Sequence, residues 1–120
     1  MSWATSRPLS PVPFSWEPAP PVSPEVLHLL KFARDLAAAG QTRWGRAIYQ
    51  WAARKDATGA ARNEYACFLC SREDYDAAFA ELRTLAREAW ERRSAHAWSA
   101  ACHNLAVVSR AAGDADMARA

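Results

Sequence analysis

Cys67 and Cys70 form a C-x-x-C pair, a spacing that occurs in metal knuckles and in redox dithiols. A structural zinc site needs about four ligands that converge on one point. The chain has no second C-x-x-C pair, and Cys102 and His103 are neighbours that would point about 100° apart on a helix. His96 would have to turn inward to join the cysteines. The ligand count therefore predicts no metal and no cofactor.

Redox and hydrolytic chemistry also lack support in the sequence. A catalytic C-x-x-C pair gains a lowered thiol pKa at the start of a helix, whereas this pair falls in the later half of a predicted helix. His103 precedes Asn104, but no serine, cysteine or carboxylate stands at a spacing diagnostic of a triad. We therefore predict no catalytic residue and no enzymatic activity. The two cysteines are interpreted as small, mildly apolar residues without a chemical role.

The composition favours a single helical domain. Alanine occurs 28 times among 120 residues and glycine only 4 times, a balance that suits helices rather than sheets. The net charge is only +2 and no basic run is present, so a nucleic-acid partner is not indicated. No segment is apolar enough for a membrane span, and three cysteines suggest the reducing cytoplasm. Thirteen arginines against two lysines suggest a bacterial source.

The N-terminal residues differ from the rest of the chain. All seven prolines precede residue 25, so residues 1–22 are predicted to be an extended or disordered arm. The arm carries Trp3, Phe14 and Trp16. One hypothesis is that Phe14 and Trp16 fold back across the surface that binds a partner, until the partner displaces them.

Helix signals follow the arm. Ser23, Asp74 and Ser94 are predicted N-caps, and Gly40 is a predicted helix end. Gly113-Asp114 is expected to end the fifth helix and to begin a short sixth one. Four tryptophans are expected to pack in the core or between repeats: Trp44, Trp51, Trp90 and Trp98. The first predicted helix starts at Pro24 and ends at Gly40, and the second ends near Lys55. The remaining predicted helices cover 60–71, 75–92, 95–112 and the residues after 113.

The chain resembles the tetratricopeptide repeat family. The resemblance rests on Leu29, Phe32-Ala33, Leu36 and Gly40 in one unit, on Tyr65-Ala66, Leu69, Asp74-Tyr75, Ala78, Leu82 and Leu85 in the next, and on Asn104-Leu105-Ala106, Gly113-Asp114 and Ala118 in the third. It implies an all-α, right-handed solenoid of stacked antiparallel helix hairpins over residues 23–120, divided at about 25–57, 59–93 and an incomplete 94–120. It also implies that Ala78 and Ala118 lie at close helix contacts.

In proteins similar to this family, one face of each first helix lines a concave groove where partners bind. By the repeat offsets, the predicted groove residues are Leu30, Arg34, Asn63, Cys67, Cys70, His103, Val107 and Arg110. The expected function is therefore a scaffold that binds a protein or peptide. Two alternatives stay open: a regulatory or sensor domain of a transcription-related or other multidomain protein, and an accessory helical domain of an enzyme. Because the last unit is incomplete, self-association through residues 95–120 is also expected.

Overall fold

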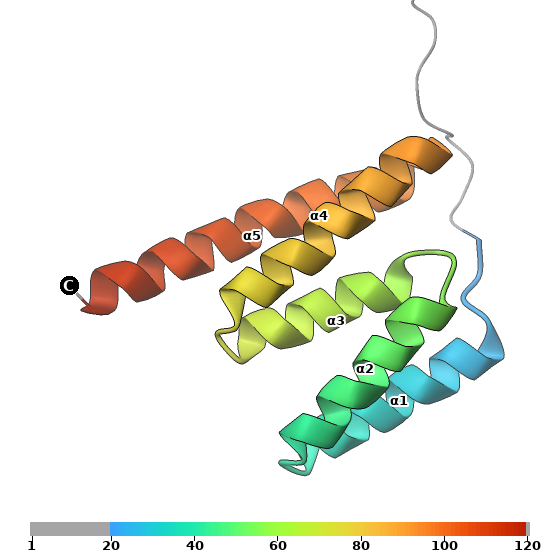
Figure 1. Ribbon diagram of the computed structural model, residues 1–120, viewed down its shortest axis with the longest axis horizontal. Helices are drawn as coiled ribbons and strands as arrows, with labels where there is room; N and C mark the ends of the chain where they lie inside the picture. The colour runs from blue at the N-terminus through green and yellow to red at the C-terminus, as the bar shows by residue number, and fades with distance from the viewer. Residues whose placement is uncertain (1–19, 120) are drawn as a thin grey trace, which may run out of the picture.

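The computed structural model describes residues 20–119 and consists of helices joined by short turns (Figure 1). Within this range the predicted all-α class is confirmed, and no strand occurs. The predicted arm lies outside the described residues except for its last three, and so do Trp3, Phe14 and Trp16. The five helices are α1 (Pro24–Ala38), α2 (Thr42–Lys55), α3 (Ala60–Ser71), α4 (Tyr75–Arg92) and α5 (Ala95–Arg119).

Three predicted capping side chains begin helices. The Ser23 hydroxyl accepts a hydrogen bond from the Val26 backbone N–H at 3.2 Å, and Pro24 occupies the first turn. The Asp74 carboxylate accepts from the Ala77 N–H at 3.3 Å at the start of α4. Ser94 does the same for α5 through the Ala97 N–H. Each bond satisfies a donor that the first turn of a helix leaves unpaired.

The α1–α2 and α3–α4 turns repeat one geometry. Gly40 ends α1 with φ +83°, and Glu73, 33 residues later, ends α3 with φ +62°. The next N–H in each turn donates back to the helix, from Gln41 to the Leu36 carbonyl and from Asp74 to the Leu69 carbonyl. This is the Schellman pattern, in which a left-handed residue lets a helix satisfy its last carbonyls.

Each helix packs against the next one along the chain, and α3 also contacts α5. In Figure 1, α2 and α4 lie in front of α1 and α5. The Cα atoms extend 63 × 44 × 16 Å, and the thin dimension fits two layers of helices about 8–10 Å apart. Leu69, Leu82 and Leu85 are the largest fully buried side chains. They place the centre of the core between α3 and α4.

Small residues let the paired helices approach closely. A Cβ at Gly45 would lie 3.3 Å from both the Ala33 carbonyl oxygen and the Ala37 nitrogen. Ala33, Ala66 and Ala78 have no exposed surface. The predicted burial of Ala78 is therefore confirmed, and any larger side chain there would force α3 and α4 apart.

The predicted helix end at Gly113 is wrong. α5 continues without interruption from Ala95 to Arg119, and residues 20–119 contain no sixth helix. A glycine inside a helix costs only about 1 kcal/mol relative to alanine, whereas a new helix would need a new nucleus. Ala118 is consequently exposed and does not lie at a close helix contact. No helix within the described range is both long and apolar enough to cross a membrane.

The predicted burial of most tryptophans is also wrong. Trp44 is 63% exposed, Trp51 48% and Trp90 46%. Only Trp98 is partly buried, and its ring lies 5.1 Å from that of Trp90. Three of the four buried residues of α2 are small, namely Gly45, Ala52 and Ala53, and the close approach to α1 at Gly45 leaves no space for an indole there.

Candidate binding groove

The first helix of the second hairpin, α3, runs alongside α5, and two hollows lie between them. The first hollow, of about 260 Å³, is lined by Pro20, Val22, Thr58, Gly59, Ala60, Asn63, Leu85, His96, Ala97 and Ala100. The second, also of about 260 Å³, is lined by Cys67, Cys70, Ser71, Leu82, Asn104, Val107 and Val108. We call the two together the α3–α5 groove. Its floor is formed by α4, which contributes a leucine to each hollow.

Local sequence explains why α3 and α5 present these residues. On α3, positions 60, 63, 67 and 70 follow helical spacing and share one side of the helix. On α5, positions 97, 100, 104 and 107 do the same. The large apolar residues Tyr65 and Leu69 fall on the other side of α3 and are buried against the core. The groove side is thereby left to small and polar residues.

A hydrogen bond between two asparagines separates the hollows. The Asn104 Nδ2 atom donates to the Asn63 Oδ1 atom at 2.7 Å. No other hydrogen bond is formed by either side-chain amide within residues 20–119. The Asn63 side chain therefore keeps its NH₂ donors, and the Asn104 side chain keeps its carbonyl acceptor. Together they offer a donor and an acceptor at the centre of an otherwise mostly apolar groove.

The Cys67 thiol in the second hollow is not activated. Partial burial raises the pKa of the Cys67 thiol, and the neighbouring Cys70 adds to this effect. A raised pKa keeps the thiol protonated at neutral pH, which makes it a poor nucleophile and a poor ligand. No group of three or more His, Cys, Asp or Glu side chains suited to a metal ion occurs in the described part of the chain.

Four of the predicted groove residues are brought together by the structure. Asn63 lines the first hollow, and Cys67, Cys70 and Val107 line the second. Val107 is 46% exposed, whereas Val108, which lines the same hollow, is buried. The α3 stripe expected from the sequence is thus present in full.

The other four predicted groove residues lie elsewhere. Leu30 is buried in the core, where it contributes nothing to a surface. The Arg34 guanidinium donates to both carboxylate oxygens of Glu64, at 2.6 and 2.7 Å, which occupies its paired donors. His103 and Arg110 are exposed on α5 but line neither hollow.

Sequence reasoning missed Asn104, the residue that faces Asn63. The repeat offset of 40 residues placed His103 opposite Asn63, whereas the hydrogen bond joins residues 41 apart. One residue on a helix is a rotation of about 100°, enough to move a side chain out of the groove. The helical spacing of positions 97, 100, 104 and 107 could have identified Asn104, because it is the one polar residue among these four positions.

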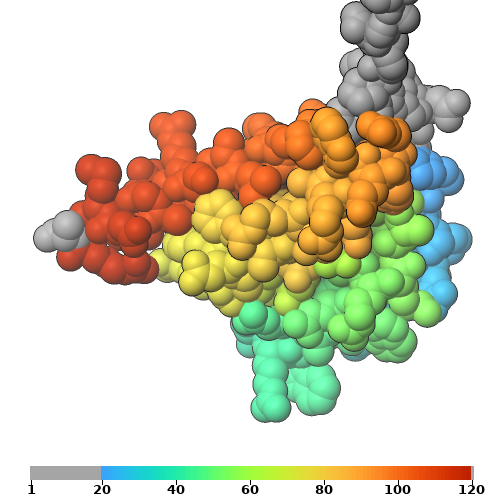
Figure 2. All heavy atoms as spheres, turned by 45° about the horizontal axis from the view of Figure 1, so that its top comes forward, coloured from blue at the N-terminus to red at the C-terminus, as the bar shows by residue number. Residues whose placement is uncertain are grey.

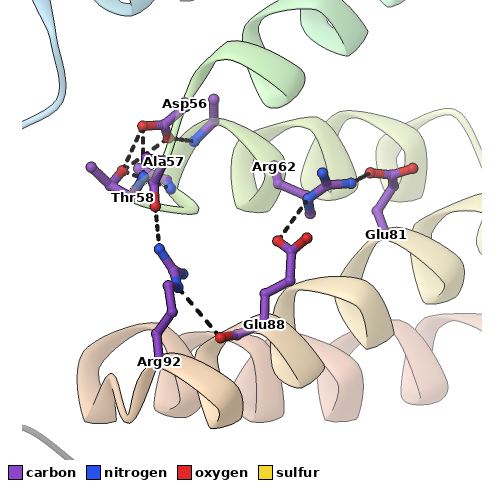
Figure 3. Close-up of polar contacts among 9 residues, drawn as sticks. Asp56, Ala57, Thr58, Arg62, Glu81, Glu88 and Arg92 are labelled. Carbon is purple, nitrogen blue, oxygen red and sulfur yellow. Dashed lines mark hydrogen bonds and ion pairs between the residues drawn. The ribbon is translucent and has the colours of Figure 1, made fainter.

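A third hollow, of about 360 Å³, is charged and serves the structure of the α2–α3 turn (Figure 3). The Asp56 carboxylate accepts from the Thr58 hydroxyl and from the Ala61 N–H. Arg62 donates to Glu81 at 2.7 Å, and Arg92 donates to the Ala57 carbonyl. These paired groups hold the turn against α4, and the two arginines are already engaged.

No protein-family model matches this chain, and comparisons with curated proteins and with solved structures give no match either.

Proposed function

We propose that the five helices form a tetratricopeptide-like stack. The turns at Gly40 and Glu73 repeat the same geometry at the 33-residue offset, which supports this arrangement. The close approach at Gly45 in the first hairpin and at Ala78 in the second supports it as well. On this proposal α5 is the first helix of a third unit.

The proposed function is non-catalytic binding of an extended segment of a partner protein in the α3–α5 groove. The observation that carries the proposal is the Asn63–Asn104 pair between two hollows of equal volume. An extended backbone presents an N–H and a C=O at every residue, and its side chains alternate. The asparagine pair is suited to hold that backbone while the hollows accept apolar side chains on either side.

The lining of the groove favours a peptide over a nucleic acid. No lysine or arginine is among the described residues that line its two hollows. Binding to a phosphate backbone depends on such cations. The raised pKa of the Cys67 thiol makes it a poor nucleophile. His96 is the one histidine among the described residues that line the groove, and it is exposed. Binding without reaction is therefore the function that fits these residues.

Selection of peptides from a random displayed library, followed by fluorescence-anisotropy measurement of each Kd, tests the proposal. Asn104→Ala and Val107→Glu should each weaken binding at least tenfold. Gln50→Ala removes an exposed amide on α2 and serves as the matched control, which should leave Kd unchanged. Selected peptides that bind all three variants equally would place the binding site outside the groove.

A further inference from the structure

The α1–α2 hairpin exposes an apolar surface on its side away from α3. Arg34 and Tyr49 both hydrogen-bond to Glu64 of α3, which identifies the flank that α3 covers. Residues two apart on a helix point in nearly opposite directions, about 200° apart. Phe32 and Leu36 flank Arg34 in this way, and Trp51 follows Tyr49 by two. We call the resulting surface the hairpin face, which comprises Leu29, Phe32, Leu36, Trp44, Ile48 and Trp51.

One edge of the hairpin face is fixed by an ion pair. Lys55 at the end of α2 lies 3.2 Å from Glu25 at the start of α1. The antiparallel helices therefore bring their apolar residues side by side along the hairpin. Figure 2 shows this hairpin, blue to green, at one end of the molecule, with the C-terminal half of α5, in red, projecting at the other.

The second hairpin shows what such a surface is built to contact. Phe32 and Leu36 correspond, 33 residues later, to Tyr65 and Leu69, which are only 3% and 1% exposed. Tyr65 is covered by α2, whose Tyr49 ring stacks 6.1 Å from its own. The same positions on the first hairpin have no preceding hairpin within the described residues. A contiguous aromatic surface of this kind marks an interaction site.

The charges on α1 and α2 favour a second copy of this chain as the partner of the hairpin face. α2 carries Arg43, Arg46, Arg54 and Lys55 and no acidic residue, so two α2 helices would repel each other. On α1, Asp35 remains 64% exposed despite its ion pair with Lys31. If a two-fold axis runs along the hairpin face parallel to its helices, α1 of each copy lies over α2 of the other. Asp35 then falls beside Arg43 of the second copy, because both are exposed and lie at the turn end of the hairpin, Asp35 in the last turn of α1 and Arg43 in the first turn of α2.

The area is sufficient for a weak pair. An aromatic side chain has a surface of about 200 Å². Because Phe32, Trp44 and Trp51 are each about half exposed or more, together they expose roughly 330 Å² of aromatic surface per copy. Two copies bury about twice that from these residues alone. The remaining apolar and charged rim brings the total near the lower limit of about 1,000 Å² for a specific interface.

We propose that this protein forms a two-fold dimer through the hairpin face, with Trp44 of each copy packed beside Leu36 of the other and Trp51 beside Leu29. Closed two-fold pairs are the commonest form of self-association, since one surface serves both partners. The dimer leaves the α3–α5 groove of each copy open. It therefore presents two binding grooves instead of one.

Sedimentation equilibrium of the full chain over a concentration series tests the dimer. The mass should rise from 13.3 kDa to twice that value and then stay constant. Trp44→Glu/Trp51→Glu should remain monomeric at every concentration. Met117→Glu, which alters the most exposed apolar residue of α5, should associate like the parent. A mass that never rises, a mass that exceeds two copies, or loss of association in Met117→Glu alone would overturn the proposal.

A charge exchange keeps the test decisive if the tryptophan variant does not fold. Asp35→Arg and Arg43→Asp are both changes of exposed side chains. Each should weaken the dimer roughly tenfold, since each introduces two symmetric repulsive contacts. The double variant Asp35→Arg/Arg43→Asp should recover the parent affinity. Weakening by either single change without recovery in the double variant would exclude the two-fold arrangement.

Discussion

Asn104 of α5 donates a 2.7 Å hydrogen bond to Asn63 of α3, across the groove between these two helices. The bond joins residues 41 apart in sequence and is partly buried. It links α3 to α5 at two residues that line the groove, because Asn63 lines one hollow and Asn104 lines the other.

Removal of either asparagine should reduce stability modestly. Asn63→Ala or Asn104→Ala should each lower the free energy of unfolding by about 0.5–1.5 kcal/mol, the usual net value of such a bond. In a double-mutant cycle, the double variant should lose less than the sum of the two single losses, because the second change removes a partner that is already gone. Urea unfolding of the four proteins measures this coupling. Strict additivity would mean that the bond is not formed in solution.

Ala78 and Ala80 should differ sharply in their tolerance of leucine. Ala78 is fully buried at the contact of α4 with its hairpin partner, whereas Ala80 is exposed. Ala78→Leu should cost about 1–3 kcal/mol through overpacking, and Ala80→Leu should be nearly neutral. Thermal melts followed by circular dichroism compare them. Equal melting temperatures would show that the helices are not in close contact at Ala78.

Three glycines separate steric from conformational effects. At Gly59, φ is +87° and an added Cβ would lie 2.6 Å from Leu85 Cδ1. Gly40 has φ +83° but open space, and Gly113 lies inside α5 with open space. Gly59→Ala should therefore be the most destabilising of the three and Gly40→Ala intermediate, while Gly113→Ala should stabilise by about 0.5–1 kcal/mol. Urea unfolding ranks them, and a destabilising Gly113→Ala would contradict the continuous α5 helix.

Local signals explain how much of the fold could be predicted. Ser23, Asp74 and Ser94 act through their own neighbouring N–H groups, so their caps are visible in sequence. Gly40 likewise determines its own turn. At Gly113 the same residue type gave the wrong prediction, because the outcome there depends on the helix-forming residues on both sides rather than on the glycine.

Groove residues and tryptophans depended on geometry that sequence spacing does not fix. The α3 stripe of Asn63, Cys67 and Cys70 was predictable because it lies within one helix. Its partner on α5 required the offset between α3 and α5 to be known to a single residue, and Asn104 was missed for that reason. The exposure of Trp44 follows from the close α1–α2 contact at Gly45, which a composition rule about aromatic burial does not contain.

Tyr49 should make stability fall at alkaline pH. Burial, together with the hydrogen bond that its hydroxyl donates to Glu64 at 3.0 Å, raises its pKa from 10.0 to about 12. Because the folded-state pKa is the higher one, its contribution is complete below pH 10 and disappears as the pH rises through 12. At pH 11 the loss is about 1.4 kcal/mol.

Tyr49→Phe isolates this contribution. The variant lacks the titrating hydroxyl, so the gap in unfolding free energy between parent and variant should shrink by about 1.4 kcal/mol from pH 8 to pH 11. Other tyrosines and the lysines titrate in both proteins and cancel in the comparison. A gap that stays constant between these pH values would show that the Tyr49 pKa is not raised.

Cys67 should react slowly with alkylating reagents. Burial and the neighbouring Cys70 raise the pKa of its thiol above the usual 9.0, and only the thiolate is nucleophilic. A Cys70→Ser/Cys102→Ser variant retains Cys67 as its single cysteine and keeps its burial, which is the larger cause of the raised pKa. Its alkylation by iodoacetamide at pH 7.5 should be slower than that of a cysteine in a short unstructured peptide. The rate should continue to rise with pH beyond 9, where the peptide rate has begun to level. A faster reaction than the peptide, or stoichiometric zinc in the purified parent protein by elemental analysis, would show that the C-x-x-C pair is a chemical site after all.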